Sequence, residues 1–270
     1  TIADWLPADW TKGPGIEELT FRQLLQHRSG LNGNDSSDPY ELDDLESYVS
    51  AGINPADKFF VYQNANFALF RVAIPYLRYG PAAMALIETL LYPLVDRASV
   101  ISILYKDIVR DYAFAPTGFV TADCAPHDNA ATRLYAYPPA GGPGFANGDW
   151  TVKCGSGGWF MSTVELVGFM AHRRFGQTMS ADARALMDSR YLGWMAPQNY
   201  AWANGLYGIY RSHGGDLTYD NVLPERGLDA CIMEYPNGVQ TALLINSIGG
   251  AYAYQCAELA DAYDNAFIVP

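Results

Sequence analysis

The chain has 270 residues, half of them hydrophobic, so it is long enough to bury a sizeable core. Its formal charge of -12 and pI near 4.6 disfavour nucleic acid and anionic membranes as partners, because both would repel this surface. The most apolar run, Pro81 to Val95, is interrupted by Glu88 and Pro93, so the sequence predicts no membrane span. We find no segment of linker composition and expect one domain over residues 1–270.

The four cysteines, at positions 124, 154, 231 and 256, have no metal-ligand spacing, and we expect neither a metal nor a cofactor. Their even number favours an exported protein, secreted or periplasmic, with up to two disulfides. Cys231 falls in a predicted strand and Cys256 in the predicted final helix, so these two could pair and leave Cys124 with Cys154. Four buried thiols are the alternative.

The first two thirds of the chain carry helix signals. Capping boxes begin at Thr20 and at Ser162, and Ser180 is a further N-cap. The helices we predict from these signals and from apolar spacing are a short one after Thr20 that ends at Gly30, then 43–49, 66–77, segments within 82–112 broken at Pro93, 163–176 and 181–191. A long stretch rich in Pro, Gly, Asp and Asn lies between Ala115 and Asn147 and either lines a site or packs irregularly.

The pattern changes after residue 200. Strands are predicted over 206–211, 228–235 and 239–245, and Pro236-Asn237-Gly238 is typical of a hairpin turn. Apolar residues from Tyr252 to Phe267 recur at helical spacing and predict a helix that covers this sheet. The fold class is therefore α+β, with residues 15–200 mainly helical and residues 201–270 forming a sheet and a C-terminal helix.

The segment Val61 to Asn66 holds the first candidate site residues. Tyr62 and Asn64 are two positions apart, so their side chains point to the same side if the segment is extended. A phenol can move a proton, and a carboxamide can hold a substrate amide or a lysine head group. The structural alternative is a buried tyrosine and an asparagine at a helix start.

Four segments in order resemble landmarks of one superfamily. They are 24–31 (Leu-Leu-Gln-His-Arg-Ser-Gly-Leu), 62–64 (Tyr-Gln-Asn), 157–163 (Gly-Gly-Trp-Phe-Met-Ser-Thr) and 213–215 (His-Gly-Gly). Together they resemble the serine beta-lactamase and penicillin-binding-protein superfamily, in particular its class C-like branch of esterases, D-aminopeptidases and transpeptidase-related hydrolases. The resemblance covers essentially the whole chain and implies an antiparallel sheet with flanking helices packed on a helical subdomain.

The resemblance also implies roles for individual residues. Tyr62 matches the tyrosine of the second motif, which helps to move the nucleophile's proton, and Asn64 matches the residue that orients the substrate or the catalytic lysine. His213 occupies the third motif, where beta-lactamases carry a lysine. Gly214 and Gly215 would let a substrate lie against the strand, and the backbone amide of Asp216 would form half of an oxyanion hole.

One landmark of the superfamily is missing. Its nucleophile is the serine of Ser-x-x-Lys, and no serine in this chain has a lysine three residues later. Ser102 precedes Lys106 by four positions, which is the wrong spacing. In the superfamily the motif lies upstream of the segment that residues 2–7 resemble.

Three interpretations follow from this departure. The favoured one places Ser-x-x-Lys on a segment of the precursor, as a separate N-terminal peptide, because loss of a central helix and strands would leave an apolar cavity and an unpaired sheet edge. The second is a catalytically inactive binding or scaffold protein. The third is an amidase with Thr1 as an N-terminal nucleophile. The sequence thus predicts a serine hydrolase acting on a small-molecule or peptide ester or amide (carboxylesterase, D-amino-acid peptidase or beta-lactamase-like) through an acyl-enzyme.

Overall fold

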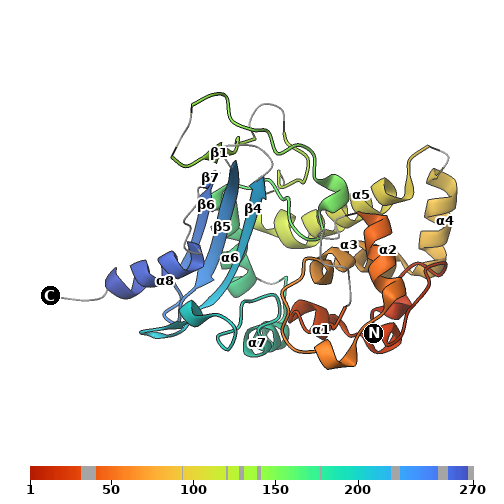
Figure 1. Cartoon of the computed structure of the whole chain (residues 1–270), viewed down its shortest axis with the longest axis horizontal. Helices are drawn as coiled ribbons and strands as arrows, with labels where there is room; N and C mark the ends of the chain where they lie inside the picture. The colour runs from red at the N-terminus through yellow and green to blue at the C-terminus, as the bar shows by residue number, and fades with distance from the viewer. Residues whose placement is uncertain are drawn as a thin grey trace. The chain divides into compact units, whose positions relative to one another are not determined.

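A computed structural model describes residues 1–31, 41–92, 94–119, 121–127, 131–138, 141–176, 178–219, 226–248 and 255–266. The chain forms two compact units, drawn together in Figure 1. Unit 1 comprises residues 1–125 and 149–160, and unit 2 comprises residues 126–148 and 161–270. We describe each unit by itself.

Unit 1 is helical. Its α-helices are α1 (Phe21–Leu25), α2 (Leu42–Ala51), α3 (Ala65–Tyr79), α4 (Pro81–Leu91) and α5 (Arg97–Val109), with short helical turns at Ala3–Trp5, Ile16–Glu18, Pro55–Asp57, Arg110–Phe114, Ala115–Thr117 and Thr151–Lys153. Helix α3 is central, because it packs against α1, α2, α4 and α5. The capping box at Thr20 is confirmed: its hydroxyl accepts from the Gln23 amide, and the Gln23 side chain accepts from the Thr20 amide. The break expected at Pro93 lies outside the described residues.

The glycine-rich turn at residues 155–158 serves close packing within unit 1. A Cβ on Gly155 would lie 2.8 Å from Cβ of Arg71 and 2.9 Å from the carbonyl oxygen of Ala68. Gly158 has a positive φ of 84° and lies against the Trp150 side chain. Only glycine allows the chain to pass α3 this closely and to turn in this way.

Unit 2 contains the sheet (Figure 1). Its strands are β1 (Tyr135–Ala136), β2 (Asn204–Gly205), β3 (Gly208–Ile209), β4 (Arg211–Tyr219), β5 (Arg226–Glu234), β6 (Gln240–Ile245) and β7 (Ser247–Ile248). Strand β4 lies at one end of the five-stranded sheet and pairs with β5, which also pairs with β6 and β1. The predicted β5–β6 hairpin is confirmed, with Gly238 at its turn.

Three sequence predictions about this unit need correction. The strand expected over 206–211 is instead a tight two-stranded turn, β2–β3, followed by the start of β4. The sheet is not wholly antiparallel, because β1 and β7 pair in parallel. Helices α6 (Thr163–Phe175) and α7 (Ala181–Arg190), which the sequence pattern placed with the helical part, belong to unit 2.

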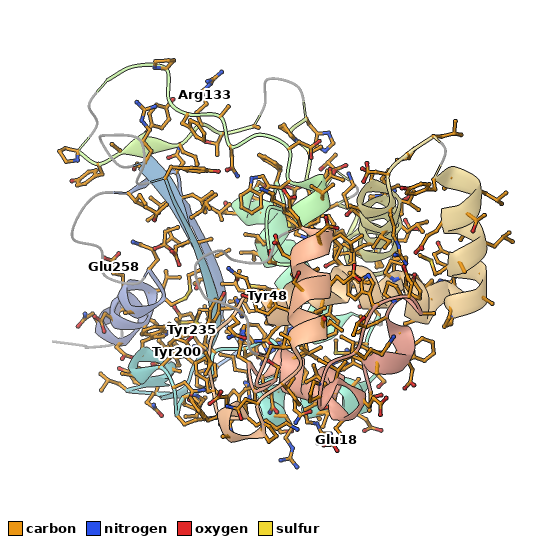
Figure 2. All side chains as sticks on the ribbon, turned by 45° about the vertical axis from the view of Figure 1, so that its right-hand side comes forward. Glu18, Tyr48, Arg133, Tyr200, Tyr235 and Glu258 are labelled. Carbon is orange, nitrogen blue, oxygen red and sulfur yellow. A yellow bond between two sulfur atoms is a disulfide. The ribbon has the colours of Figure 1, made fainter. Side chains whose placement is uncertain are left out.

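Opposite faces of the sheet are held by different interactions. On one face the disulfide Cys231–Cys256 ties β5 to helix α8 (Gln255–Ala266), and Tyr235 donates to the carbonyl of Leu259 on the same helix. Figure 2 labels Tyr235 near one end of the sheet and Glu258 on α8. On the other face Glu234 of β5 pairs with Arg173 of α6. Tyr252 and Phe267, the ends of the predicted final helix, lie outside the described residues.

Both expected disulfides form. Cys124 pairs with Cys154 in unit 1, and Cys231 pairs with Cys256 in unit 2. Each links segments 25 or 30 residues apart, which restricts the unfolded chain. Among the described residues, no helix is both long and apolar enough to cross a membrane.

Candidate active site

The segment before α3 is held in place by His27. This buried histidine has a left-handed backbone (φ 52°), its carbonyl accepts from the Val61 amide, and its Nδ1 accepts from the Gln63 amide at 3.2 Å. The His27 ring stacks on the Tyr62 ring, with 4.3 Å between ring centroids. His27 is therefore a structural residue, and Tyr62, on which its ring stacks, is 41% exposed.

Asn64 ends this segment at the N-cap position of α3. Its backbone already has helical dihedral angles (φ -61°, ψ -28°), and its carbonyl accepts from the Ala68 amide. Residues 62–64 form no strand, and Asn64 itself has helical backbone angles, so a shared direction of the Tyr62 and Asn64 side chains stays a prediction. An N-cap asparagine usually accepts a backbone N–H, but the Asn64 side chain makes no such bond, so its carboxamide is not used to start the helix.

The His213-Gly214-Gly215 segment lies on β4, as predicted, at the end of the sheet. Nδ1 of His213 lies 2.8 Å from the carbonyl oxygen of Gly193. Because a carbonyl only accepts, Nδ1 carries the proton and Nε2 is the basic nitrogen of this ring. Burial lowers the pKa of His213, with the Gly193 hydrogen bond opposing it, so the ring is neutral at neutral pH.

Among the described residues, no strand pairs with the edge of β4 that faces away from β5, apart from a single bridge between Met195 and Ser212. The register with β5 is regular from Arg211 to Tyr219. In an antiparallel ladder, backbone groups of alternate residues point to the same side. The Ser212 carbonyl points away from β5, because it accepts from the Met195 amide at 2.7 Å. The Asp216 amide, four residues further along, therefore also points away from β5.

The two glycines differ in their surroundings. A Cβ on Gly214 would lie 3.3 Å from Sγ of Cys256, on the face covered by α8. A Cβ on Gly215 would meet no heavy atom of the described residues within 4 Å. The strand therefore needs a small residue at Gly214 for its own packing, whereas Gly215 leaves open space next to the Asp216 amide.

An acidic pair that sequence reasoning missed lies across the strands. Asp216 and Asp229 are directly opposed in the β4–β5 register. Burial raises the pKa of Asp229 to about 6, and the charges of Asp216 and Glu258 add to this effect. Only the strand register could have revealed this pair, because the two residues are 13 positions apart.

The described chain offers no internal substitute for Ser-x-x-Lys on α5. Ser102 is completely buried, and its Oγ has no hydrogen-bond partner among the described residues. The Lys106 ammonium pairs with Asp123. The hydroxyl of Thr1, the other candidate nucleophile, donates to Asp4.

Each unit contains a cavity lined by residues outside the motifs. One, in unit 1, is lined by residues of the N-terminal segment and of α2, α3, α4 and α5 and holds six carboxylates and one arginine. The other lies in unit 2 and is lined by four arginines. Neither is lined by Tyr62, Asn64 or residues 213–216, so cavity volume does not locate the candidate active site.

Comparisons with known proteins identify the family. The family model described as Beta-lactamase matches residues 1–250, and the chain belongs to this family. No curated protein matches. Among solved structures, FmtA from Staphylococcus aureus is similar at 14% identity over 91% of this chain and 63% of that one, with a TM-score of 0.57. A class C beta-lactamase is similar at 12% identity over 100% of this chain and 77% of that one, with a TM-score of 0.60.

A beta-lactamase/D-alanine carboxypeptidase from Yersinia pestis is similar at 11% identity over 98% of this chain and 74% of that one, with a TM-score of 0.55. At these identities the structural matches establish the fold alone. The chain spans less than two thirds of FmtA and about three quarters of the other two proteins. Family membership and fold therefore agree with the resemblance seen in the sequence, and the chain has a beta-lactamase-like α+β fold.

Proposed function

We propose that this protein is a serine hydrolase that cleaves an ester or amide of a small molecule or peptide through an acyl-enzyme. Family membership supports a serine hydrolase-like function, and two disulfides support a secreted or periplasmic location. The nucleophilic serine is supplied by a Ser-x-x-Lys segment outside these 270 residues. Similar proteins are longer than this chain, which is consistent with such a segment.

In this proposal Tyr62 takes the proton from the nucleophile and returns it to the leaving group. Asn64 holds the substrate amide or the lysine of the upstream segment. His213, neutral and with its basic Nε2, accepts a hydrogen bond from the substrate or assists the proton transfer. The Asp216 amide donates to the oxyanion of the tetrahedral intermediate.

The observation that carries the proposal is the free edge of β4. An oxyanion hole needs a backbone N–H that no neighbouring strand uses, next to enough space for an acyl group. The Asp216 amide points away from β5, and Gly215 leaves that space open. A strand kept only for packing has no need of an open glycine at its edge, since a β-branched or aromatic residue would pack better there.

An inactive binding or scaffold protein is the alternative, and the absence of Ser-x-x-Lys from this chain favours it. The two functions differ in one measurable property. A hydrolase turns over a chromogenic ester or a D-alanyl peptide when the upstream segment is present, whereas a binding protein retains the ligand unchanged.

Turnover of such substrates by the protein with its upstream coding region tests the proposal. Tyr62→Phe and Asn64→Ala should each lower kcat/KM by about 100-fold or more, the order expected for loss of a proton-transferring or orienting group. Arg22→Gln, an exposed change on α1, serves as the control. Turnover that is unaffected by both site variants would contradict the assigned roles.

A further inference from the structure

Unit 2 contains a cavity of about 240 Å³ that is lined by none of the candidate active-site residues. Its walls come from the end of α6, from α7, from the start of β4 and from the end of β5. The lining residues are Arg173, Arg174, Arg184, Asp188, Arg211, Glu234, Tyr235 and Pro236. Four arginines and two carboxylates leave a formal charge of +2, on a chain whose own charge is -12.

One carboxylate is shared by three of the arginines. Glu234 is buried, and it pairs with Arg173, with Arg174 at 2.8 Å and with Arg211 at 3.7 Å. Asp188, the second carboxylate, pairs with Arg173 at 3.0 Å. A carboxylate has one negative charge, so Glu234 cannot neutralise all the guanidinium groups around it.

No carboxylate of the described residues forms an ion pair with Arg184. Its Nη1 donates to the carbonyls of Gly176 and Met179, at 2.9 and 2.7 Å, and no ion pair joins it to a described residue. The Nη2 groups of Arg174, Arg184 and Arg211 likewise make no hydrogen bond within the described chain, and Nε of the buried Arg173 has no partner there. The cavity therefore presents several donors and an excess of positive charge.

We propose that this cavity is a binding site for a small oxyanion of charge -2, a phosphate group or a short dicarboxylate. Guanidinium groups match the oxygens of both with paired hydrogen bonds. The volume is below the 300 to 1,000 Å³ typical of pockets for drug-sized ligands, so the occupant is small. A dianion would cancel the charge of +2 and bridge α6 and α7 to the sheet.

A purely structural ion-pair network is the competing explanation. Arg173, Arg174 and Glu234 are accounted for in that way, because cations at the end of α6 also favour the helix dipole. Arg184 and Arg211 are not, since one contacts only main-chain carbonyls and the other lies 3.7 Å from the nearest carboxylate. The test therefore uses these two residues.

Calorimetric titration of the protein with inorganic phosphate and with succinate, and thermal unfolding in each, test the proposal. Sodium chloride at the same ionic strength is the reference. We expect at least one dianion to raise Tm above the chloride value, as a ligand bound only to the folded state must. If the protein binds phosphate but not succinate, the ligand of the site is a phosphate group. If it binds succinate but not phosphate, the ligand is a dicarboxylate.

Arg184→Gln and Arg211→Gln should each weaken the binding by about tenfold or more, the loss expected for a charged hydrogen bond. Arg190→Gln, at the exposed end of the same helix α7, is the matched control and should bind as the wild type does. Unfolding in chloride checks that each variant is folded, and either arginine variant is sufficient for the comparison. Equal Tm in the dianions and in chloride, or unchanged binding in both folded variants, would overturn the proposal.

Discussion

The completely buried guanidinium of Arg71 leads to a stability prediction for unit 1. Arg71 lies in the middle of α3, and none of its three nitrogens has a hydrogen-bond partner among the described residues. Burial lowers the pKa of Arg71 from 12.5 to about 10, although electrostatic interactions with Tyr105 and Glu41 act to raise it. A buried cation without a partner destabilises the fold, because the interior does not replace the water that solvated it.

Replacement of Arg71 by methionine removes the charge and keeps most of the apolar stem. The lowered pKa corresponds to about 3 kcal/mol of unfavourable burial, at about 1.36 kcal/mol for each unit. Imperfect packing of the new side chain costs about 1 kcal/mol. We therefore expect Arg71→Met to raise the free energy of unfolding by about 2 kcal/mol and Tm by roughly 4 to 8 °C.

Urea unfolding followed by circular dichroism measures this change as a shift of the midpoint at constant m-value. Arg78→Met, on the exposed side of the same helix, is the matched control and should stay within about 0.5 kcal/mol of the wild type. Destabilisation of Arg71→Met by about 3 kcal/mol or more would refute the reasoning, because that result is typical of a broken ion pair. It would mean that the guanidinium has a partner outside the described residues.

Three further predictions concern the candidate site. Tyr62→Phe should reduce turnover by about 100-fold with a change in unfolding free energy below about 1 kcal/mol, since Tyr62 is an exposed residue and the ring is kept. A large stability loss with normal specific activity would contradict a catalytic Tyr62. Gly215→Ala should fold normally and lose turnover. Gly214→Ala should lower Tm, because a Cβ at position 214 meets Sγ of Cys256 whereas a Cβ at position 215 meets no described atom. Equal activities and equal Tm values of the two variants would count against the role of the β4 edge. The carboxyl of Asp229 has a folded pKa of about 6, above its unfolded value of 3.8, so its charged form opposes folding. The free energy of unfolding should therefore fall as pH rises from about 4 through 6. Asp229→Asn should remove this pH dependence and add about 1 kcal/mol to the free energy of unfolding at pH 7.5, allowing for solvent screening. An unchanged pH profile of unfolding in the variant would show that Asp229 is not its cause.

Local signals in the sequence predicted much of the secondary structure. The capping boxes at Thr20 and Ser162 begin helices, because each pairs a hydroxyl with a residue three positions later and needs no distant partner. The Pro236-Asn237-Gly238 turn closes a hairpin for the same reason, since Gly238 adopts a positive φ of 89°.

Longer-range features were beyond the sequence. The parallel pairing of β1 with β7 joins two strands of two residues that are 112 positions apart, and no periodicity can develop over two residues. An amphipathic helix such as α6 buries one face, but its pattern does not say which core it packs on. The start of β4 at Arg211 was misplaced because Gly205 and Gly208 allow a tight turn within an otherwise apolar run.

The candidate site was predicted unevenly. Tyr62, Asn64 and His213 were recognised from motifs in order along the chain, and His213 does lie on the end strand of the sheet. The shared direction of the Tyr62 and Asn64 side chains stays a prediction, because residues 62–64 form no strand and Asn64 is the N-cap of α3. The arginine cavity and the Asp216–Asp229 pair depend on strand register and helix packing, which a single sequence does not contain.

Covalent labelling tests the central claim most directly. The folded protein, expressed with its upstream coding region, is treated with a fluorophosphonate probe and analysed by denaturing mass spectrometry. We predict one added probe group on a serine of a Ser-x-x-Lys segment, either within a longer chain or on a peptide that accompanies these 270 residues, and slower labelling in Tyr62→Phe. An unlabelled protein whose upstream sequence contains no Ser-x-x-Lys would contradict the hydrolase assignment and support a binding protein instead.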